Sequence, residues 1–182
     1  MSEIKLLSDS LINKIAAGEV LERPASAVKE LVENSIDAGA KKIDIFIGNG
    51  GKSNITVLDD GQGIKKDELE KAVLRHTTSK LNSSNLNCIK TMGFRGEALS
   101  SIASVSDFSI SSNQKNNSEG YEIKIVSGKV KHVKPINQKK GTCVKVRNLF
   151  FSTPARLKFL KSENYESILI KRLIQNFSII HF

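Results

Sequence analysis

Three polar side chains at helical spacing have the clearest capacity for chemistry in this sequence. Glu30, Asn34 and Asp37 occupy positions i, i+4 and i+7, so one helix would carry all three on one face. Carboxylate and amide oxygens are the ligands that a hard cation prefers, and a carboxylate can act as base for a water that attacks a phosphate. Considered alone, the same helix could equally present an ordinary solvated polar face.

A helix that would position these side chains is predicted through residues 28–39, entered at Pro24 near its first turn and left at Gly39. Pro24 suits the first turn of a helix and Gly39 suits a C-terminal cap. An apolar stripe at helical spacing would anchor this helix on a core; it consists of Val28, Leu31, Val32 and Ile36.

A second candidate site follows a predicted strand at residues 55–58. Asp59, Gly61 and Gly63 come directly after this strand and precede a predicted helix at residues 67–75. A buried aspartate at a strand end can accept a hydrogen bond from an exocyclic amine such as that of adenine, and glycines let the backbone approach a flat ring. A tight turn capped by the aspartate is the alternative.

A third candidate is the glycine pair Gly93 and Gly96, which lies directly before another predicted helix. Backbone N–H groups at a helix N-terminus form an anion site suited to phosphates, whereas a flexible hinge is the alternative. Upstream, Thr78, Ser79 and Lys80 offer two hydroxyls and an ammonium to the same phosphates. Their alternative is a helix end that runs into a solvated loop.

The remaining pattern predicts an α+β fold. Alternating residues predict strands at 43–47, 55–58, 121–125, 130–134 and 142–146, with a further strand from Phe108. Further helices are predicted at residues 10–20, from Pro154 through Lys161 and at 165–175, and the final apolar stretch could begin a strand. Polar loops are expected at 77–93 and 113–118. Short hairpin connections favour a two-layer arrangement of helices on one face of a mixed, mostly antiparallel sheet, in a single domain over residues 1–182.

Composition limits the function classes. The chain has 28 Lys+Arg and 19 Asp+Glu, a formal charge of +9, which admits a polyanionic partner, but a general lysine bias would give the same number. Cys88 and Cys143 lack metal-ligand spacing and favour a reduced cytoplasmic protein. Neither a Walker-type nor a Rossmann-type glycine motif is present, and the three histidines are isolated. We expect no secretory signal and no membrane-spanning segment.

Taken in order, these segments resemble the Bergerat-type ATP-binding fold shared by DNA gyrase, heat-shock chaperones, histidine kinases and MutL. The resemblance narrows to the MutL family of DNA mismatch repair through six segments, which run through most of the chain: residues 15–20 (IAAGEV), 23–26 (RPAS), 29–34 (KELVEN), 37–39 (DAG), 93–99 (GFRGEAL) and 153–156 (TPAR).

The resemblance implies ATP and Mg²⁺ as cofactors and a role for each matching residue. Glu30 is implied as the general base, Asn34 as the Mg²⁺ ligand, and Asp59 as the adenine-recognising carboxylate, helped by Gly63 and Thr142. Asp37 is implied at the nucleotide site. The implied lid and phosphate contacts are Thr78, Ser79, Lys80, Gly93, Phe94, Arg95, Gly96, Glu97, Ala98 and Leu99.

The resemblance also implies a function: an ATPase module in which ATP binding orders a lid and closes a dimer during repair. Implied partners are a MutS-type protein, DNA at low salt and a second copy of the protein, without a membrane, in a bacterial cytoplasm near the nucleoid or in a eukaryotic nucleus. MutL proteins continue into a second subdomain that supplies a lysine, a linker and a C-terminal dimerisation domain. We therefore expect weak hydrolysis here; the alternative is a nucleotide- or DNA-binding fragment without turnover.

Two positions depart from the family pattern. Asp60 stands where many relatives carry asparagine, and its added charge is expected to weaken ATP binding. Ser152 stands where relatives often carry asparagine, and we attach no functional consequence to it.

Overall fold

The computed structural model of the chain describes residues 6, 12, 15, 17–18, 21–78, 80, 91–93, 96–114 and 118–181. Within this part, the strands form one six-stranded sheet in the order β1-β2-β6-β3-β4-β5. Every neighbouring pair in it is antiparallel. The strands are β1 (Ile43–Gly48), β2 (Asn54–Asp59), β3 (Asp107–Asn113), β4 (Gly120–Val126), β5 (Lys129–Ile136) and β6 (Gly141–Arg147).

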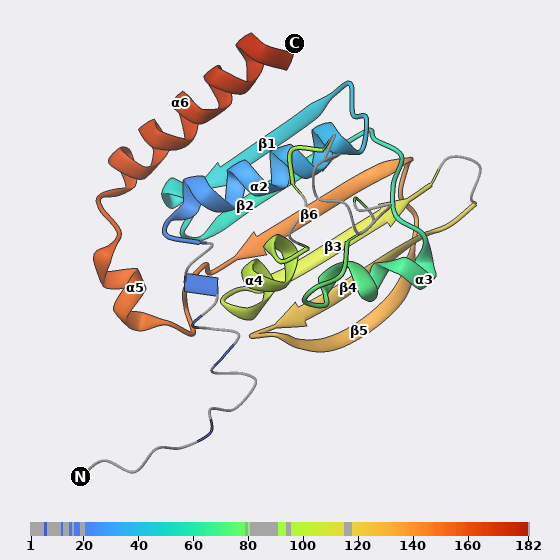
Figure 1. Cartoon of the computed structure of the whole chain (residues 1–182), viewed down its shortest axis with the longest axis horizontal. Helices are drawn as coiled ribbons and strands as arrows, with labels where there is room; N and C mark the ends of the chain where they lie inside the picture. Colours follow the sequence, from blue (N-terminus) through green and yellow to red (C-terminus); the bar gives the residue numbers. More distant parts are fainter. Residues whose placement is uncertain are drawn as a thin grey trace.

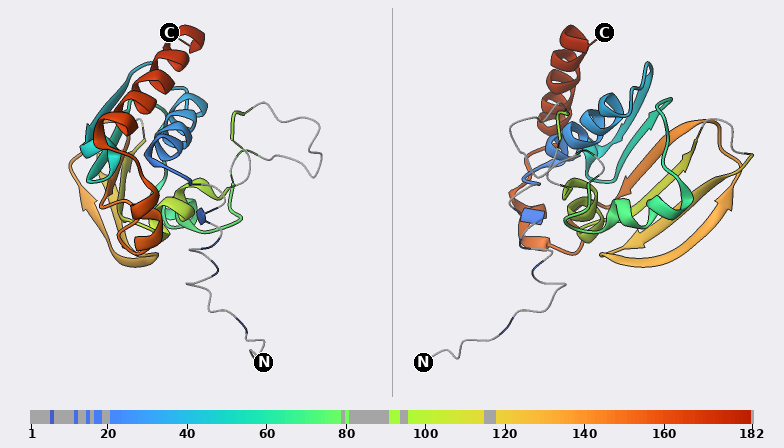
Figure 2. Two further views of the ribbon diagram at one scale, coloured as in Figure 1. Left: turned by 90° about the vertical axis from the view of Figure 1, so that its left-hand side faces the viewer. Right: turned by 45° about the vertical axis from the view of Figure 1, so that its right-hand side comes forward.

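Helices cover one face of this sheet. Figure 1 shows α2 (Pro24–Asp37), α3 (Lys66–Leu69) and α4 (Ala98–Ser104) in front of the strands, and Figure 2 shows them on the same side in two further views. The longest helix, α6 (Glu163–His181), follows the short α5 (Pro154–Phe159) and packs against α2 and the 3₁₀ helix η1 (Asn49–Gly51). The predicted two-layer α+β arrangement is confirmed.

The core lies between the helices and the sheet because the central strands turn apolar side chains at alternate positions toward the helices. The apolar set of β2, β3, β4 and β6 is buried: Ile55, Val57, Phe108, Ile110, Ile123, Ile125, Val144 and Val146. From the other side, α2 buries Val28, Leu31 and Val32, and Ile36 packs against them, as its periodicity predicts. This packing also fixes the polar face of α2, which carries Glu30, Asn34 and Asp37, on the side of the helix that does not contact the core.

Three predicted helices differ in extent. The helix expected at 67–75 is divided into α3 and the 3₁₀ helix η2 (Lys71–Val73). α5 ends at Phe159, before the expected Lys161. The prediction that the last residues could begin a strand is wrong, since α6 continues to His181. No glycine or proline stops this helix, and apolar pairs such as Ile179 and Ile180 suit either structure in isolation.

The N-terminal helix predicted at residues 10–20 lies mostly outside the described residues. Ala17 is fully buried in the core, whereas Ile12 and Ile15 of the expected apolar stripe are exposed. The predicted loop at 77–93 and Cys88 also lie largely or wholly outside the described part. The polar loop expected from Asn113 begins later, because Asn113 is the last residue of β3 and is buried. Among the helices described, none combines the length and apolarity needed to cross a membrane.

Candidate functional site

The polar face of α2 presents the first predicted cluster. The ammonium of Lys80 lies 2.7 Å from Oδ1 of Asn34 and 2.6 Å from Oδ2 of Asp37, so one cation contacts both side chains. Glu30 lies one helical turn before Asn34, and its side chain is 27% exposed. The predicted grouping of Glu30, Asn34 and Asp37 on one helix face is confirmed as geometry, and Lys80 joins it.

Lys29 and Glu33 are charged neighbours of Glu30 on the same helix. Nζ of Lys29 lies 2.8 Å from Oε1 of Glu33 and 3.7 Å from Oε1 of Glu30. Burial raises the pKa of Glu30, the positive charge of Lys29 opposes this rise, and the nearby carboxylate of Glu33 adds to it. A carboxylate with a raised pKa is a stronger proton acceptor once ionised, which suits a general base.

Asp59 is held by hydrogen bonds on both of its oxygens. Oδ1 accepts the backbone N–H of Gly61 at 3.0 Å and that of Thr142 at 3.2 Å, while Oδ2 accepts the hydroxyl of Ser35 at 2.9 Å. Burial raises the pKa of Asp59 against the lowering effect of these hydrogen bonds. Sequence reasoning paired Asp59 with Thr142, and the antiparallel register places the two opposite each other.

Two hydroxyl residues of this region were missed by sequence reasoning. Ser35 follows Asn34 directly and points to the core side of α2, where it reaches Asp59. Ser112, in β3, accepts the N–H of Ile64 at 2.8 Å and lies 2.9 Å from the hydroxyl of Thr142. A serine among apolar helix positions was the available signal for Ser35, because a buried hydroxyl requires a partner.

The glycine at position 63 has a structural requirement. Its φ is +75°, and a Cβ there would overlap the backbone carbonyl of Asn113. Glycine therefore lets the segment after Asp59 lie against the end of β3. The sequence predicted that a glycine here lets the backbone approach a flat ring. In the structure the backbone of Gly63 lies against the backbone of Asn113.

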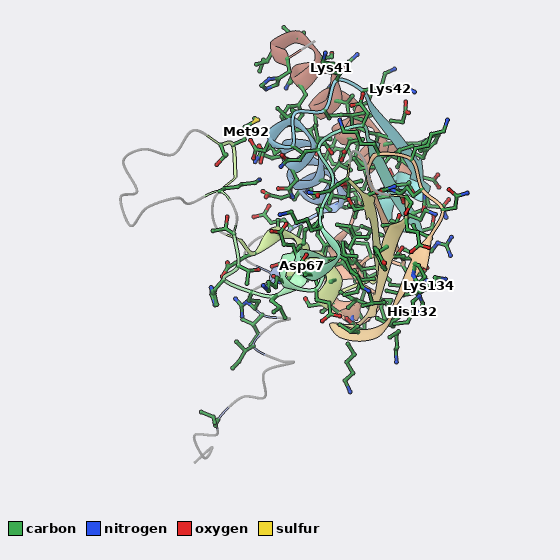
Figure 3. The ribbon with its side chains drawn as sticks, turned by 90° about the vertical axis from the view of Figure 1, so that its right-hand side faces the viewer. Lys41, Lys42, Asp67, Met92, His132 and Lys134 are labelled. Atoms are coloured by element: carbon green, nitrogen blue, oxygen red, sulfur yellow. The ribbon has the colours of Figure 1, made fainter. Side chains whose placement is uncertain are left out.

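Residues 92–93, which precede α4, are hydrogen-bonded to the last residue of α2. Asp37 accepts the backbone N–H of Met92 on Oδ1 at 3.0 Å and that of Gly93 on Oδ2 at 3.3 Å. Figure 3 shows Met92 on the helix side of the sheet. Burial alone would raise the pKa of Asp37, but the hydrogen bonds from Lys80, Met92 and Gly93 outweigh it and lower that pKa.

The other residues predicted as lid or phosphate contacts make contacts of their own within the protein. Glu97 lies beside Arg75 at 3.6 Å and His76 at 3.2 Å, and α4 begins directly after it with Ala98 and Leu99. The hydroxyl of Thr78 accepts the backbone N–H of Lys80 at 3.1 Å. Gly96 has φ +64° and packs against the backbone of Thr77. Ser79, Phe94 and Arg95 lie outside the described residues.

The carboxylate of Asp60 accepts hydrogen bonds from the backbone of the turn after α2. Its Oδ1 accepts the backbone N–H groups of Lys41 and Lys42 at 2.8 and 2.9 Å, which lower its pKa. The residue thus secures a turn, and the expected weakening of ATP binding stays a prediction.

The oxygens on α2 suit a hard cation. Within the described part of the chain, no three His, Cys, Asp or Glu side chains are grouped to hold a metal ion. Mg²⁺, however, commonly takes one or two protein oxygens and completes its shell with water and substrate phosphates. Oδ1 of Asn34 already accommodates the cationic head of Lys80. This donor set fits Mg²⁺ held chiefly through phosphates.

Comparison with known proteins gives a consistent result. Residues 22–148 match the family described as histidine kinase-, DNA gyrase B- and HSP90-like ATPases. The chain is 52% identical to the DNA mismatch repair protein MutL of Rhizobium etli (strain CIAT 652) over 176 residues, 97% of this chain and 29% of that protein. It is 50% identical to MutL of Rickettsia bellii (strain OSU 85-389) over 178 residues, 98% of this chain and again 29% of the relative.

Solved structures of related proteins have the same fold as this chain. The ATPase domain of Aquifex aeolicus MutL complexed with ADP superposes with a TM-score of 0.73 at 37% identity, over 88% of this chain and 56% of that one. The N-terminal domain of a DNA repair protein gives a TM-score of 0.78 at 32% identity, over 93% and 49%. The chain thus spans less than a third of the curated relatives' length. It belongs to the histidine kinase-, DNA gyrase B- and HSP90-like ATPase family, and within that family to the MutL proteins.

Proposed function

We propose that this chain binds ATP with Mg²⁺ and hydrolyses it to ADP and phosphate. One observation carries the proposal: the hydroxyl of Ser35 joins Asp59, while the adjacent Asn34 shares Lys80 with Asp37. A carboxylate suited to adenine and an amide oxygen suited to a phosphate-bound cation therefore meet at one helix. The ADP complex of the Aquifex aeolicus relative supports the same assignment.

Asp59 is proposed to recognise the base. Its oxygens are buried and fixed by Ser35, Gly61 and Thr142, so the carboxylate needs no reorientation to accept a hydrogen bond from the adenine amine. Guanine carries a carbonyl oxygen at the corresponding position and would face the carboxylate with an acceptor. We therefore expect discrimination in favour of adenine nucleotides.

Glu30 is proposed as the general base for the attacking water. The carboxylate is anchored on a helix whose opposite face is packed in the core, so its position is rigid. Asn34 is proposed to hold Mg²⁺, which neutralises phosphate charge when bound. Lys80 and the N–H groups of Met92 and Gly93 are the described donors that can reach phosphate oxygens.

The role in repair rests on the relatives' names. We propose that ATP binding orders a lid over the phosphates and promotes closure of a dimer, which then acts with a MutS-type partner on DNA in the cytoplasm or nucleus. A second candidate is nucleotide or DNA binding without turnover, and the basic side chains on the sheet face opposite the helices favour its DNA-binding part.

DNA contact has its own support on the face of the sheet opposite the helices. A shallow depression of about 240 Å³ there is lined by Asp107, Ser109, Glu122, Lys124, His132, Lys134, Lys145 and Arg147. Figure 3 shows His132 and Lys134 on the side away from Met92. Lys124 pairs with Asp107, and Lys134 pairs with Glu122. No such pair is found for Lys145 or Arg147 among the described residues, so both are available to phosphates.

Phosphate release from ATP, measured with and without Mg²⁺, tests the proposed activity. Wild-type chain should release phosphate only with Mg²⁺. Glu30→Gln should stop release while a non-hydrolysable ATP analogue still binds, and Asp59→Asn should impair binding itself. Glu68→Gln, on the exposed surface of α3, is the matched control and should behave as wild type. Binding without release in the wild-type chain would favour the second candidate, and identical behaviour of all variants would refute both assignments.

A further inference from the structure

We propose that Asp37 is a built-in competitor of phosphate: its carboxylate occupies the donors that the nucleotide's phosphates must take over. This inference rests on the proposed function, because it assigns a regulatory role within the same site. It differs from the role implied by the family resemblance, in which Asp37 belongs to the residues that favour nucleotide binding.

The contacts of Asp37 are those of a bound anion. Oδ2 accepts from the ammonium of Lys80 at 2.6 Å and from the N–H of Gly93 at 3.3 Å, and Oδ1 accepts from the N–H of Met92 at 3.0 Å. The aspartate side chain is 8% exposed and that of Lys80 is 20% exposed. Three donors from two segments therefore converge on one largely dehydrated carboxylate.

The donor set is the one that phosphates use elsewhere. An ammonium combined with backbone N–H groups at a glycine binds phosphate oxygens through charge-assisted hydrogen bonds. A carboxylate and a phosphate both present negatively charged oxygens to such donors. Each backbone N–H can serve one strong acceptor at a time, so phosphate binding through the N–H groups of Met92 and Gly93 requires Asp37 to release them. The ammonium of Lys80 has three hydrogens, and there Asp37 competes with the phosphate for the position of the positive charge.

The same release affects the proposed metal ligand. Lys80 also donates to Oδ1 of Asn34 at 2.7 Å, so the ammonium covers the oxygen that Mg²⁺ would need. A movement of the whole ammonium away from α2 onto a phosphate would release the oxygens of both Asp37 and Asn34. One displacement thus opens both the phosphate donors and the cation ligand.

Asp37 on this account lowers the affinity of the site for phosphates and holds residues 91–93 against α2 until a ligand competes successfully. Its removal should tighten phosphate binding. A direct nucleotide contact through Asp37, or one through a bound cation, predicts the opposite sign, which makes the inference decidable.

The test is calorimetric titration with two probes, inorganic tripolyphosphate and a non-hydrolysable ATP analogue, each with Mg²⁺. Tripolyphosphate carries the phosphate chain without adenine and therefore reports on these donors independently of Asp59. We expect Asp37→Ala to bind tripolyphosphate about tenfold more tightly than wild type, with a smaller gain for Asp37→Asn, which keeps one acceptor oxygen. If Asp37→Ala fails to fold, as judged by circular dichroism, Asp37→Asn decides the result.

Glu33→Gln is the matched control. It removes one negative charge from the same helix, but Glu33 contacts Lys29 and none of the three donors. Its affinity for tripolyphosphate should change less than about twofold, because the charge of Glu33 is already paired with Lys29 and its carboxylate competes for none of the donors.

The two proposals fail separately. Tighter tripolyphosphate binding by the Asp37 variants supports the competitor role even if the ATP analogue binds to none of the chains, a result that would overturn only the proposed nucleotide function. Equal or weaker tripolyphosphate binding by both Asp37 variants overturns the competitor role. The absence of tripolyphosphate binding to any chain, or an equal gain in Glu33→Gln, overturns it as well.

Discussion

The hydroxyl of Ser35 donates a 2.9 Å hydrogen bond to Oδ2 of Asp59, which ties the helix that carries Glu30 and Asn34 to the end of β2. The same hydroxyl lies 3.2 Å from the carbonyl of Leu31, one turn earlier in α2. With a single hydrogen, Ser35 can satisfy only one of these acceptors fully. Its contact with Asp59 thus couples the carboxylate that we propose to recognise the base to the position of the helix that carries Glu30 and Asn34.

Ser35→Ala should weaken nucleotide binding without unfolding the chain. The substitution leaves Oδ2 of Asp59 without its hydroxyl donor, and a lost hydrogen bond to a charged group costs about 1.5–3 kcal/mol. Part of that cost falls on the fold, so we expect the affinity for an ATP analogue to fall about threefold to tenfold, as measured by calorimetry. Ser178→Ala, in the exposed part of α6, should change nothing. Unchanged affinity in Ser35→Ala would contradict the coupling.

Glu30→Gln should stabilise the fold at neutral pH. Burial raises the pKa of Glu30 above its ordinary value of 4.5, so the folded state binds the proton more tightly than the unfolded state and ionisation of Glu30 opposes folding. The glutamine variant removes this penalty. Its advantage in urea unfolding should be present at pH 7 and should disappear as the pH falls below about 4.5, where the wild-type carboxyl is protonated in both states. Lower stability of Glu30→Gln at pH 7 would contradict this result.

Two glycines give a paired prediction on stability. Gly141 has φ +117°, and a Cβ there would overlap the backbone carbonyl of Asp59, whereas Gly39 has φ +70° with open space around it. Gly39→Ala should cost about 1–2 kcal/mol from backbone strain alone. Gly141→Ala should cost more, about 3 kcal/mol or above, because strand β6 must also move away from Asp59. Denaturant unfolding of both variants compares them, and equal losses would show that the overlap is relieved cheaply.

Salt dependence tests the proposed DNA face. If Lys145 and Arg147 each contact a phosphate, the double variant Lys145→Gln/Arg147→Gln should bind duplex DNA more weakly, with a slope of log affinity against log salt that is smaller by about 2. The double variant Lys171→Gln/Arg172→Gln loses the same charge from the exposed side of α6 and serves as control. An identical loss in both double variants would indicate a general charge effect without a defined DNA face.

The sequence predicted those parts of the fold in which local pattern and tertiary packing agree. The stripe through Val28, Leu31 and Val32 predicted α2, and alternation predicted β2, β4 and β6, in which one apolar face is buried. Alternation also predicted β1 and β5, whose apolar residues are only partly buried. The end of α6 was missed because Ile179 and Ile180 carry no period that distinguishes helix from strand. The order of the strands was also beyond local pattern.

The candidate site was also predicted in part from local pattern, whereas the rest depends on tertiary contacts. Motif spacing identified Glu30, Asn34 and Asp59, but the residues that orient them come from distant parts of the chain. Ser35 and Asp59 are separated by 24 positions, and Asp37 and Lys80 by 43. Asp37 itself was expected to serve the nucleotide, and only its contacts in the folded chain show which donors it holds.

Calorimetric titration of a non-hydrolysable ATP analogue with Mg²⁺ into the wild-type chain and Asp59→Asn tests the central claim most directly. We expect one binding site in the wild-type chain and an affinity reduced by at least about tenfold in Asp59→Asn, because the asparagine amide would present a donor to the adenine amine. Absence of binding to the folded wild-type chain, or equal binding by the two chains, would contradict it.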